Sequence, residues 1–226
     1  MITKTQYYFD IEPIIEQVKQ MTIDRWDTQL NETEGNLLSG TYTVKEQYVN
    51  TPLGNVLETL SKELDIGEAR LLKLSSEEAY AAHCDPDDRY HLSIISNEHS
   101  YLLDLESKTM HSLPTDGYIY HMDTGITHTA VNVGPYDRVQ LNIRQRMPKC
   151  HDDPYYLVFE GEKFDGWRHY LYYDLMKYLN RRIKDKGVTG LEKITHTELL
   201  INCSVDVLED ISSMANSIGW TVKEKL

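Results

Sequence analysis

The stretch HCDPDDRYHLSI, residues 83–94, places several ionisable side chains in a segment whose later part has the composition of a β-strand. Residues i and i+2 of a strand point to the same face, so His83 and Asp85 can converge on one point while Cys84 faces away. An imidazole nitrogen and a carboxylate oxygen are two of the three ligands in a two-histidine, one-carboxylate metal site. The spacing therefore predicts part of a metal site at the start of this stretch.

A third ligand is expected from a strand that lies far away in the sequence. His128 lies in the strand-like segment THTAVNV, and Arg138 begins the next strand candidate, RVQLNIR. A guanidinium group can hold a carboxylate through two parallel hydrogen bonds. We therefore expect His128 to complete the metal site, and Arg138 to offer an anion site in the same cavity.

The segments that must position these residues are short and rich in β-branched and aromatic residues. They occupy about residues 80–145 and are separated by turn-forming residues. Short strands at such regular spacing are typical of sandwiches and barrels, and a jelly roll suits them better than a parallel βαβ sheet. The predicted fold class is therefore mainly β with helices (α+β), with a double-stranded β-helix (jelly-roll) core. The segments are RYHLSIIS, SYLLDLE, TMHSL, GYIYHM, THTAVNV and DRVQLNIR.

Helices are expected on both sides of this β-rich block. Before it, residues 12–21 have helical spacing, and residues 50–64 form the clearest helix because Thr51 can cap it and Pro52 suits its first turn. A strand is expected at residues 68–74. We assign residues 1–150 to the jelly-roll domain with its N-terminal helices.

The remainder, residues 151–226, is expected to be a C-terminal α+β extension. Its pattern indicates a helix, a strand, a second helix and a final strand, and it contains no chemical motif of its own. The segments are 167–184, 195–204, 206–219 and 220–226.

Composition excludes several classes of protein. The chain has 226 residues and a net charge of −13, which argues against a general nucleic-acid binder, because phosphate backbones require a cationic surface. Its three cysteines form no CxxC pair, and no apolar run approaches the length of a membrane span. No secretory h-region is found near the first residues. We expect a cytoplasmic protein without general binding to nucleic acids and without membrane binding, and the sequence does not indicate its oligomeric state.

The four-part pattern of His83-x-Asp85, His128 and Arg138 resembles that of the iron(II)/2-oxoglutarate-dependent oxygenases. More narrowly, HCDPDDRYHLSI followed by ITHTAVNVGPYDRVQLNI is similar to the aspartyl/asparaginyl β-hydroxylase branch, which includes some proline hydroxylases. The resemblance covers about residues 67–146. Some members of that branch lack the carboxylate ligand, and some halogenating relatives in the wider superfamily replace it to make room for halide. The presence of Asp85 therefore favours hydroxylation over halogenation.

The resemblance implies a role for each residue of the pattern. His83, Asp85 and His128 would hold Fe(II), and Arg138 would bind the far carboxylate of the cosubstrate 2-oxoglutarate. O₂ would be the oxidant.

The same resemblance implies that His91 hydrogen bonds to the cosubstrate and that Arg89 binds an acidic group of the substrate. The implied reaction is hydroxylation of an aspartyl, asparaginyl or prolyl group. That group would belong to a free amino acid or to a peptide or protein.

Other interpretations of the same residues stay open. A second His-x-Asp motif, His121-Met122-Asp123, would take His169 as its distal ligand, although His169 lies in a helical segment. CDPDD is also a good surface turn. The alternatives to an oxygenase are a cupin-like metal-dependent isomerase and a non-catalytic β-roll that binds a ligand.

Overall fold

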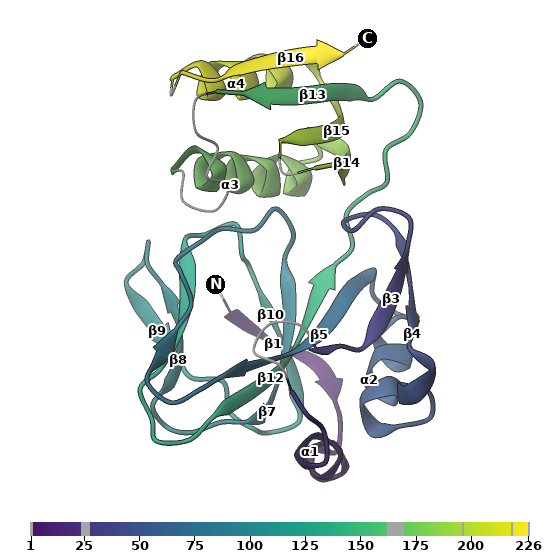
Figure 1. Ribbon diagram of the computed structural model, residues 1–226, viewed down its shortest axis with the longest axis vertical. Coiled ribbons are helices and arrows are strands. Elements are labelled where there is room, and N and C mark those ends of the chain that lie inside the picture. The colour runs from purple at the N-terminus through teal and green to yellow at the C-terminus, as the bar shows by residue number, and fades with distance from the viewer. Residues whose placement is uncertain (1, 24–27, 162–169, 196, 218, 226) are drawn as a thin grey trace.

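The computed structural model describes residues 2–23, 28–161, 170–195, 197–217 and 219–225 (Figure 1). Within these ranges the chain is mainly β with four α-helices, and all strand pairs are antiparallel, which confirms the predicted α+β class at this level. None of the described helices is both long and apolar enough to cross a bilayer.

Two sheets form the lower part of the molecule in Figure 1. The larger sheet has six strands in the order β1 (Ile2–Tyr8), β10 (Tyr118–Met122), β7 (Arg89–Ile95), β12 (Arg138–Gln145), β5 (Ile66–Leu74) and β2 (Thr28–Gln29). The smaller sheet has four strands in the order β6 (Glu78–Ala79), β11 (His128–Asn132), β8 (Ser100–Asp104) and β9 (Thr109–His111). The predicted strands of the β-rich block are confirmed.

The pairing between these strands is nested along the chain. β8 pairs with β9, and around this innermost pair β7 pairs with β10, β6 with β11 and β5 with β12. The chain therefore runs out along four strands and returns along four, and β11–β8 and β12–β7 contacts close the folded ribbon onto itself.

Strand periodicity gives the larger sheet two different faces. On one face, Leu92 of β7 and Leu141 of β12 are fully buried in an apolar cluster with Ile14 and Leu57. The last two residues belong to α1 (Ile11–Lys19) and α2 (Pro52–Leu60), which cover this face (Figure 1). Alternate residues of the same strands are polar and point to the opposite face, toward the smaller sheet.

The capping prediction for α2 is confirmed. The hydroxyl of Thr51 accepts a hydrogen bond from the backbone N–H of Gly54 at 3.2 Å, and Pro52 occupies the first turn. The helix therefore begins at these residues, because the Thr51 hydroxyl accepts one of its free N–H groups and Pro52 has no N–H to satisfy.

The C-terminal part forms a third sheet with two helices. The order is β14 (Val188–Lys193), β15 (Glu198–Cys203), β13 (Tyr155–Glu160) and β16 (Thr221–Lys225), with α3 (Tyr170–Lys184) and α4 (Val205–Ser217). Its apolar cluster also takes in Leu38, Cys84 and Met147 from the preceding part of the chain. The boundary between residues 150 and 151 stays a prediction.

Several short elements were not predicted from the sequence. They include β2, β6, β13, β14, the 3-10 helix Glu46–Tyr48, and the hairpin of β3 (Asn31–Glu34) and β4 (Thr41–Val44). In β14, Gly190 interrupts the strand-like composition. A side chain there would lie 2.5 Å from Asn202 Oδ1 and 2.8 Å from Cys150 Cα, so close packing requires the glycine.

Candidate metal centre

A cavity of about 300 Å³ lies between the two sheets of the β-rich block. Its wall combines side chains of β5, β7, β10 and β12 with side chains of β8 and β11. All six site residues predicted from the sequence line this cavity, namely His83, Asp85, Arg89, His91, His128 and Arg138.

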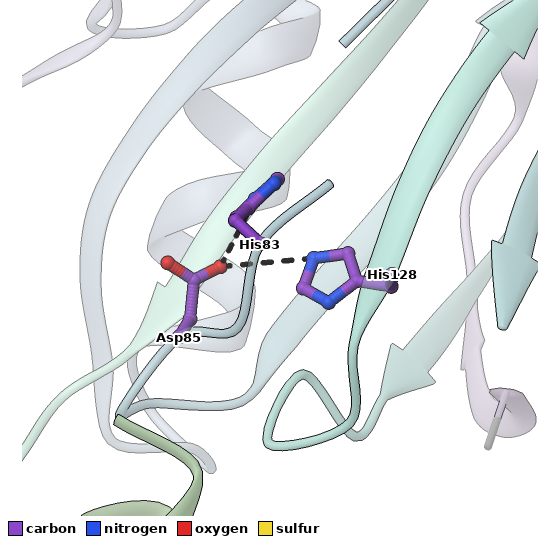
Figure 2. A group of neighbouring side chains, drawn as sticks. All are labelled: His83, Asp85 and His128. Carbon is purple, nitrogen blue, oxygen red and sulfur yellow. Dashed lines mark ion pairs between the residues drawn. The ribbon is translucent and has the colours of Figure 1, made fainter. Parts of the chain in front are cut away.

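Three of them form a compact group at one end (Figure 2). The ligand atoms of His83, Asp85 and His128 all lie within 4.8 Å of one another. Asp85 Oδ2 is 3.7 Å from His83 Nε2 and 3.9 Å from His128 Nε2. These separations are too long for hydrogen bonds, and they suit an ion between the atoms, because two metal–ligand bonds of about 2.1 Å place their donor atoms about 3 to 4 Å apart, depending on the angle at the ion.

The two imidazole rings are held in the same tautomer. His83 Nδ1 lies 2.8 Å from the carbonyl oxygen of Ala81, and His128 Nδ1 lies 2.9 Å from that of Ile126. A carbonyl oxygen only accepts, so each Nδ1 carries the proton and each neutral ring keeps its lone pair on Nε2. Burial and the neighbouring His83 lower the pKa of His128 to about 4, so this ring is neutral near pH 7.

Backbone pairing aligns the two segments that carry these ligands. His83 and His128 form an antiparallel bridge, with both N–H···O distances at 2.9 Å. The Asp85 N–H donates to the Thr124 carbonyl at 2.9 Å, and the Thr124 hydroxyl donates to the Asp87 carbonyl at 2.5 Å. The segment CDPDD, which the sequence also allowed as a surface turn, is therefore hydrogen bonded to the segment that leads into His128.

Arg89 contacts two carboxylates. Its Nη2 lies 3.0 Å from Asp85 Oδ1, and its Nη1 pairs with Asp87. Burial alone would raise the pKa of Asp85, but Arg89 and His83 lower it far below its usual value. The carboxylate of Asp85 is therefore ionised, with one oxygen on Arg89 and the other directed toward the histidines. The substrate contact expected of Arg89 stays a prediction.

The series of ion pairs continues from Asp87 along the cavity wall, away from the candidate ligands. Arg144 Nη1 lies 2.9 Å from Asp87 Oδ1, and Arg144 Nε lies 3.2 Å from Glu68 Oε2, which also pairs with Arg70. Burial disfavours the charge of Arg144, but Asp87 and the other carboxylates raise its pKa above the usual range. The sequence analysis assigned no role to Arg144. The signal that could have found it was the i, i+2 series of polar residues along β12.

At the start of β12, the charge of Arg138 is not paired with a carboxylate of the described residues in this way. Arg138 is 5% exposed, its Nη2 donates to Gln140 Oε1, and its Nη1 has no hydrogen-bond partner among the described residues. Burial lowers the pKa of Arg138 to about 10, which leaves it charged near pH 7. No carboxylate of the described residues forms a salt bridge with it.

His91 lies in the same wall, with Arg89 before it and Asn142 opposite it on β12. Neither ring nitrogen meets the geometry of a hydrogen bond within the part of the chain that the structure describes, although the side chain of Gln140 lies near enough to act on the ring. Burial, with the nearby cations Arg138 and Arg89, lowers the pKa of His91 to about 3. A neutral imidazole and a guanidinium thus both have polar atoms available to a molecule in the cavity.

The second His-x-Asp motif has a different environment. His121 Nε2 lies 3.1 Å from Asp88 Oδ2, and Asp123 Oδ1 lies 2.8 Å from Lys184 Nζ on α3. Among the described residues, the group suited to a metal ion is that of His83 and its partners, and the second motif does not belong to it. His169, its expected distal ligand, lies outside the described residues.

Comparisons with known proteins leave the family of the chain open. No protein-family profile matches the chain, and no curated protein matches it. Among solved structures, a crystal structure of CapF with the inhibitor 3-isopropenyl-tropolone has 11% sequence identity and a TM-score of 0.31 over 52% of this chain. The match spans 30% of the CapF chain, and similarity at this level carries no argument.

Proposed function

We propose that this protein is an Fe(II)- and 2-oxoglutarate-dependent dioxygenase that hydroxylates an aspartyl, asparaginyl or prolyl group. The proposal rests on the side chains that line one cavity. It combines a two-histidine, one-carboxylate group with a buried guanidinium that has no carboxylate partner among the described residues. The first feature suits a metal ion with open coordination positions, and the second suits a dianionic cosubstrate.

The donor set fits the proposed metal. Two imidazoles whose Nδ1 is bound to a backbone carbonyl, which leaves Nε2 for a metal, and one ionised carboxylate are the ligand types of the facial triad in non-haem Fe(II) oxygenases. Hydrogen bonds from each Nδ1 to a backbone carbonyl support the ring orientations, as is usual for metal-binding histidines. His83, Asp85 and His128 would hold the ion, and Arg89 would orient Asp85 through its second oxygen.

The opposite part of the cavity fits the far carboxylate of 2-oxoglutarate. Arg138 and His91 both offer polar atoms without a partner there among the described residues. A buried polar atom without a partner costs about 1–3 kcal/mol, and more when it is charged, so a ligand that satisfies these atoms removes that cost.

We further propose that the two sheets form a double-stranded β-helix core. Its support is the nested pairing, in which β5–β12 and β6–β11 enclose β7–β10 and β8–β9. Wrapping such a long antiparallel ribbon produces two facing sheets whose strands alternate along the chain, which is the arrangement of a jelly roll.

In this proposal the protein binds, orients and shields the reactants. Bound iron with 2-oxoglutarate and O₂ would supply the oxidation of a C–H bond, while the cavity walls limit the access of water. Apolar side chains such as Leu72, Leu102 and Met122 complete the lining and leave few positions for competing polar contacts.

The substrate class rests on the resemblance of residues 67–146 to the hydroxylase branch. An acidic group of a substrate would reach Arg89 only by competing with Asp87, which already pairs with it. We propose a small-molecule, peptide or protein substrate, a cytoplasmic location, and no general binding to nucleic acids or membranes.

Anaerobic titration of the metal-free protein with Fe(II) and then 2-oxoglutarate tests the proposal. The weak visible charge-transfer absorption of the iron–cosubstrate chelate is the readout. Arg138→Ala is expected to require about 10–100-fold more 2-oxoglutarate, because a charged hydrogen bond contributes about 1.5–3 kcal/mol. Arg146→Ala is the matched control, since Arg146 pairs with Asp65 and does not line the cavity.

Each other outcome points to an alternative. Tight binding of a metal without any absorption from 2-oxoglutarate would indicate a cupin-like metal enzyme instead. Indifference to every metal tested would indicate a β-roll that binds a ligand without catalysis. Equal 2-oxoglutarate affinity in Arg138→Ala and wild type would contradict the role of Arg138.

A further inference from the structure

One face of α3 contacts both chain segments that carry the candidate metal ligands. Lys177, Asn180 and Lys184 are spaced three and four residues apart, so they lie along one side of the helix. In Figure 1, α3 lies on the side of the C-terminal part that faces the two sheets of the β-rich block. The helix is therefore placed to influence the ligand-bearing segments, although no described residue of α3 lines the cavity between the sheets.

Asn180 makes the most buried of these contacts. It is 4% exposed, and its Nδ2 donates to Asp88 Oδ1 at 3.0 Å, where Asp88 is itself 5% exposed. Its other side packs on Gly125, where an added Cβ would lie 2.4 Å from Asn180 Oδ1. The amide therefore fits between two backbone segments with no space for a further methyl group.

Those two segments are the ones that lead to the candidate ligands. Asp88 follows Asp85 by three residues, and Gly125 precedes His128 by three residues. Between them, the Thr124 N–H lies 3.4 Å from Asp88 Oδ1. A displacement of Asn180 would therefore be transmitted to both segments at once.

The flanking lysines extend the same contact. Lys184 Nζ lies 3.0 Å from Asp88 Oδ1, and Lys177 Nζ donates to Glu106 Oε1 at 2.7 Å. The same Glu106 oxygen accepts the Thr127 N–H at 2.9 Å, directly before His128. Both lysines are about half exposed, with side chains at 42% and 48%, so their contributions are small beside that of Asn180.

Direct apolar packing does not fill this region. A second cavity of about 590 Å³ lies beside the contact and is lined by Asp88, Asn180 and Lys184. The connection between α3 and the loop after Asp85 therefore depends on these few polar contacts, together with Cys84, which is buried in the apolar cluster of the C-terminal part.

We infer that Asn180 is a positioning residue for the metal centre, through which α3 holds the segments of Asp85 and His128 in register. This inference rests on the proposed function, because it presupposes that His83, Asp85 and His128 bind a metal. It gives the C-terminal part of the chain a role that its own sequence does not indicate.

Co(II) binding to the metal-free full-length protein tests the inference. The affinity and the shape of the visible d–d absorption are measured in wild type, Asn180→Ala and Arg181→Ala. Arg181 is the matched control, because it is the exposed next residue of the same helix. Loss of a residue that supports metal ligands lowers affinity about 10–100-fold, and because Asp88 is not itself a ligand we expect about tenfold for Asn180→Ala, with an altered absorption.

Gly125→Ala provides a second variant that keeps the inference testable if Asn180→Ala does not fold. Its methyl group meets Asn180, so it is expected to weaken Co(II) binding by a similar factor. Adding Asn180→Ala to Gly125→Ala makes room for the methyl group, so the double variant should bind no more weakly than either single variant.

The outcomes separate this inference from the proposed function. A wild-type protein that does not bind Co(II) contradicts the metal centre itself. A wild-type protein that binds, with Asn180→Ala within twofold of it and an unchanged absorption, overturns the role of Asn180. A weaker affinity with an unchanged absorption and a lower Tm would assign Asn180 to stability alone, and this would also overturn the inference.

Discussion

The two ends of the cavity between the sheets differ in how their charges are balanced. At the end near Asp85, carboxylates and guanidinium groups contact one another in a continuous series. At the other end, Arg138 has a hydrogen bond to Gln140 but no carboxylate partner among the described residues. The series consists of Asp85, Asp87 and Glu68 with Arg89, Arg144 and Arg70.

This difference separates charges that support the fold from a charge that is available to a ligand. A buried ion that is paired and hydrogen bonded is tolerated, whereas an unpaired buried ion costs several kcal/mol. Arg138 lies next to His91, whose ring nitrogens also lack partners in the described part of the chain. An anion bound between them would restore at this end the balance that the Asp85 end already has.

The largest effect on stability is expected when a carboxylate is removed from the series of ion pairs near Asp85. Asp87→Ala removes a carboxylate that contacts both Arg89 and Arg144, and both guanidinium groups then lose a buried partner. We expect a loss of about 3–5 kcal/mol in the free energy of unfolding, measured by urea denaturation. Asp137→Ala is the control, because Asp137 pairs with Lys73 at the surface. A loss below about 1 kcal/mol for Asp87→Ala would show that the series contributes little.

Removing the charge of Arg138 is expected to stabilise the metal-free protein, in contrast to Asp87→Ala. Arg138→Met replaces a buried charge without a carboxylate by an apolar side chain of similar length, at the cost of one hydrogen bond to Gln140. We expect the metal-free protein to gain about 1–2 kcal/mol in the free energy of unfolding, while 2-oxoglutarate binding weakens by about 10–100-fold as in Arg138→Ala. A destabilised variant would indicate that Arg138 has a structural role like that of Arg89.

The pH dependence of stability reports on His91. Its pKa is about 3 in the folded protein, against about 6.5 in the unfolded chain, so between these values the unfolded chain binds the extra proton. The contribution of His91 to the free energy of unfolding is therefore fully present above about pH 6.5. It falls by about 1.4 kcal/mol per pH unit as the pH decreases below that value. His91→Gln should reduce this slope by that amount in urea titrations between pH 6.5 and 4.5. An unchanged slope would mean that His91 takes up a proton in the folded state.

The smallest effect is expected at the second His-x-Asp motif. Asp123→Asn removes a surface pair with Lys184, so the free energy of unfolding should change by less than about 1 kcal/mol. Its Co(II) affinity should stay within twofold of wild type, whereas Asp85→Asn should abolish binding. If Asp123→Asn weakened metal binding strongly, the distinction between the two motifs would be wrong.

Local patterns were enough for several parts of the prediction. Alternation along an extended segment placed His83 and Asp85 on one face, with Cys84 facing away from them. The cap of α2 at Thr51 also follows from neighbouring residues alone. These features depend on interactions within a few residues, so the sequence contains all the information they need.

The choice between the two His-x-Asp motifs is a different case. Both have the same spacing, and the sequence favoured the first only because strand-like segments with His128 and Arg138 lie downstream of it. In the structure, His83 forms a backbone bridge with His128, the first residue of β11, whereas His121 lies against Asp88. Strand pairing over such separations in sequence decides which side chains meet, and no local periodicity encodes it.

The sequence by itself thus determined which residues could serve as ligands and which face of a strand they would share. Only the tertiary structure decided which charges are neutralised. Arg89 is matched by Asp85 and Asp87, whereas Arg138 has no carboxylate partner in the described part of the chain. Asn180 reaches Asp88 from 92 residues away. Burial and pairing depend on which surfaces the folded chain brings together, and for these residues that is a property of the whole fold.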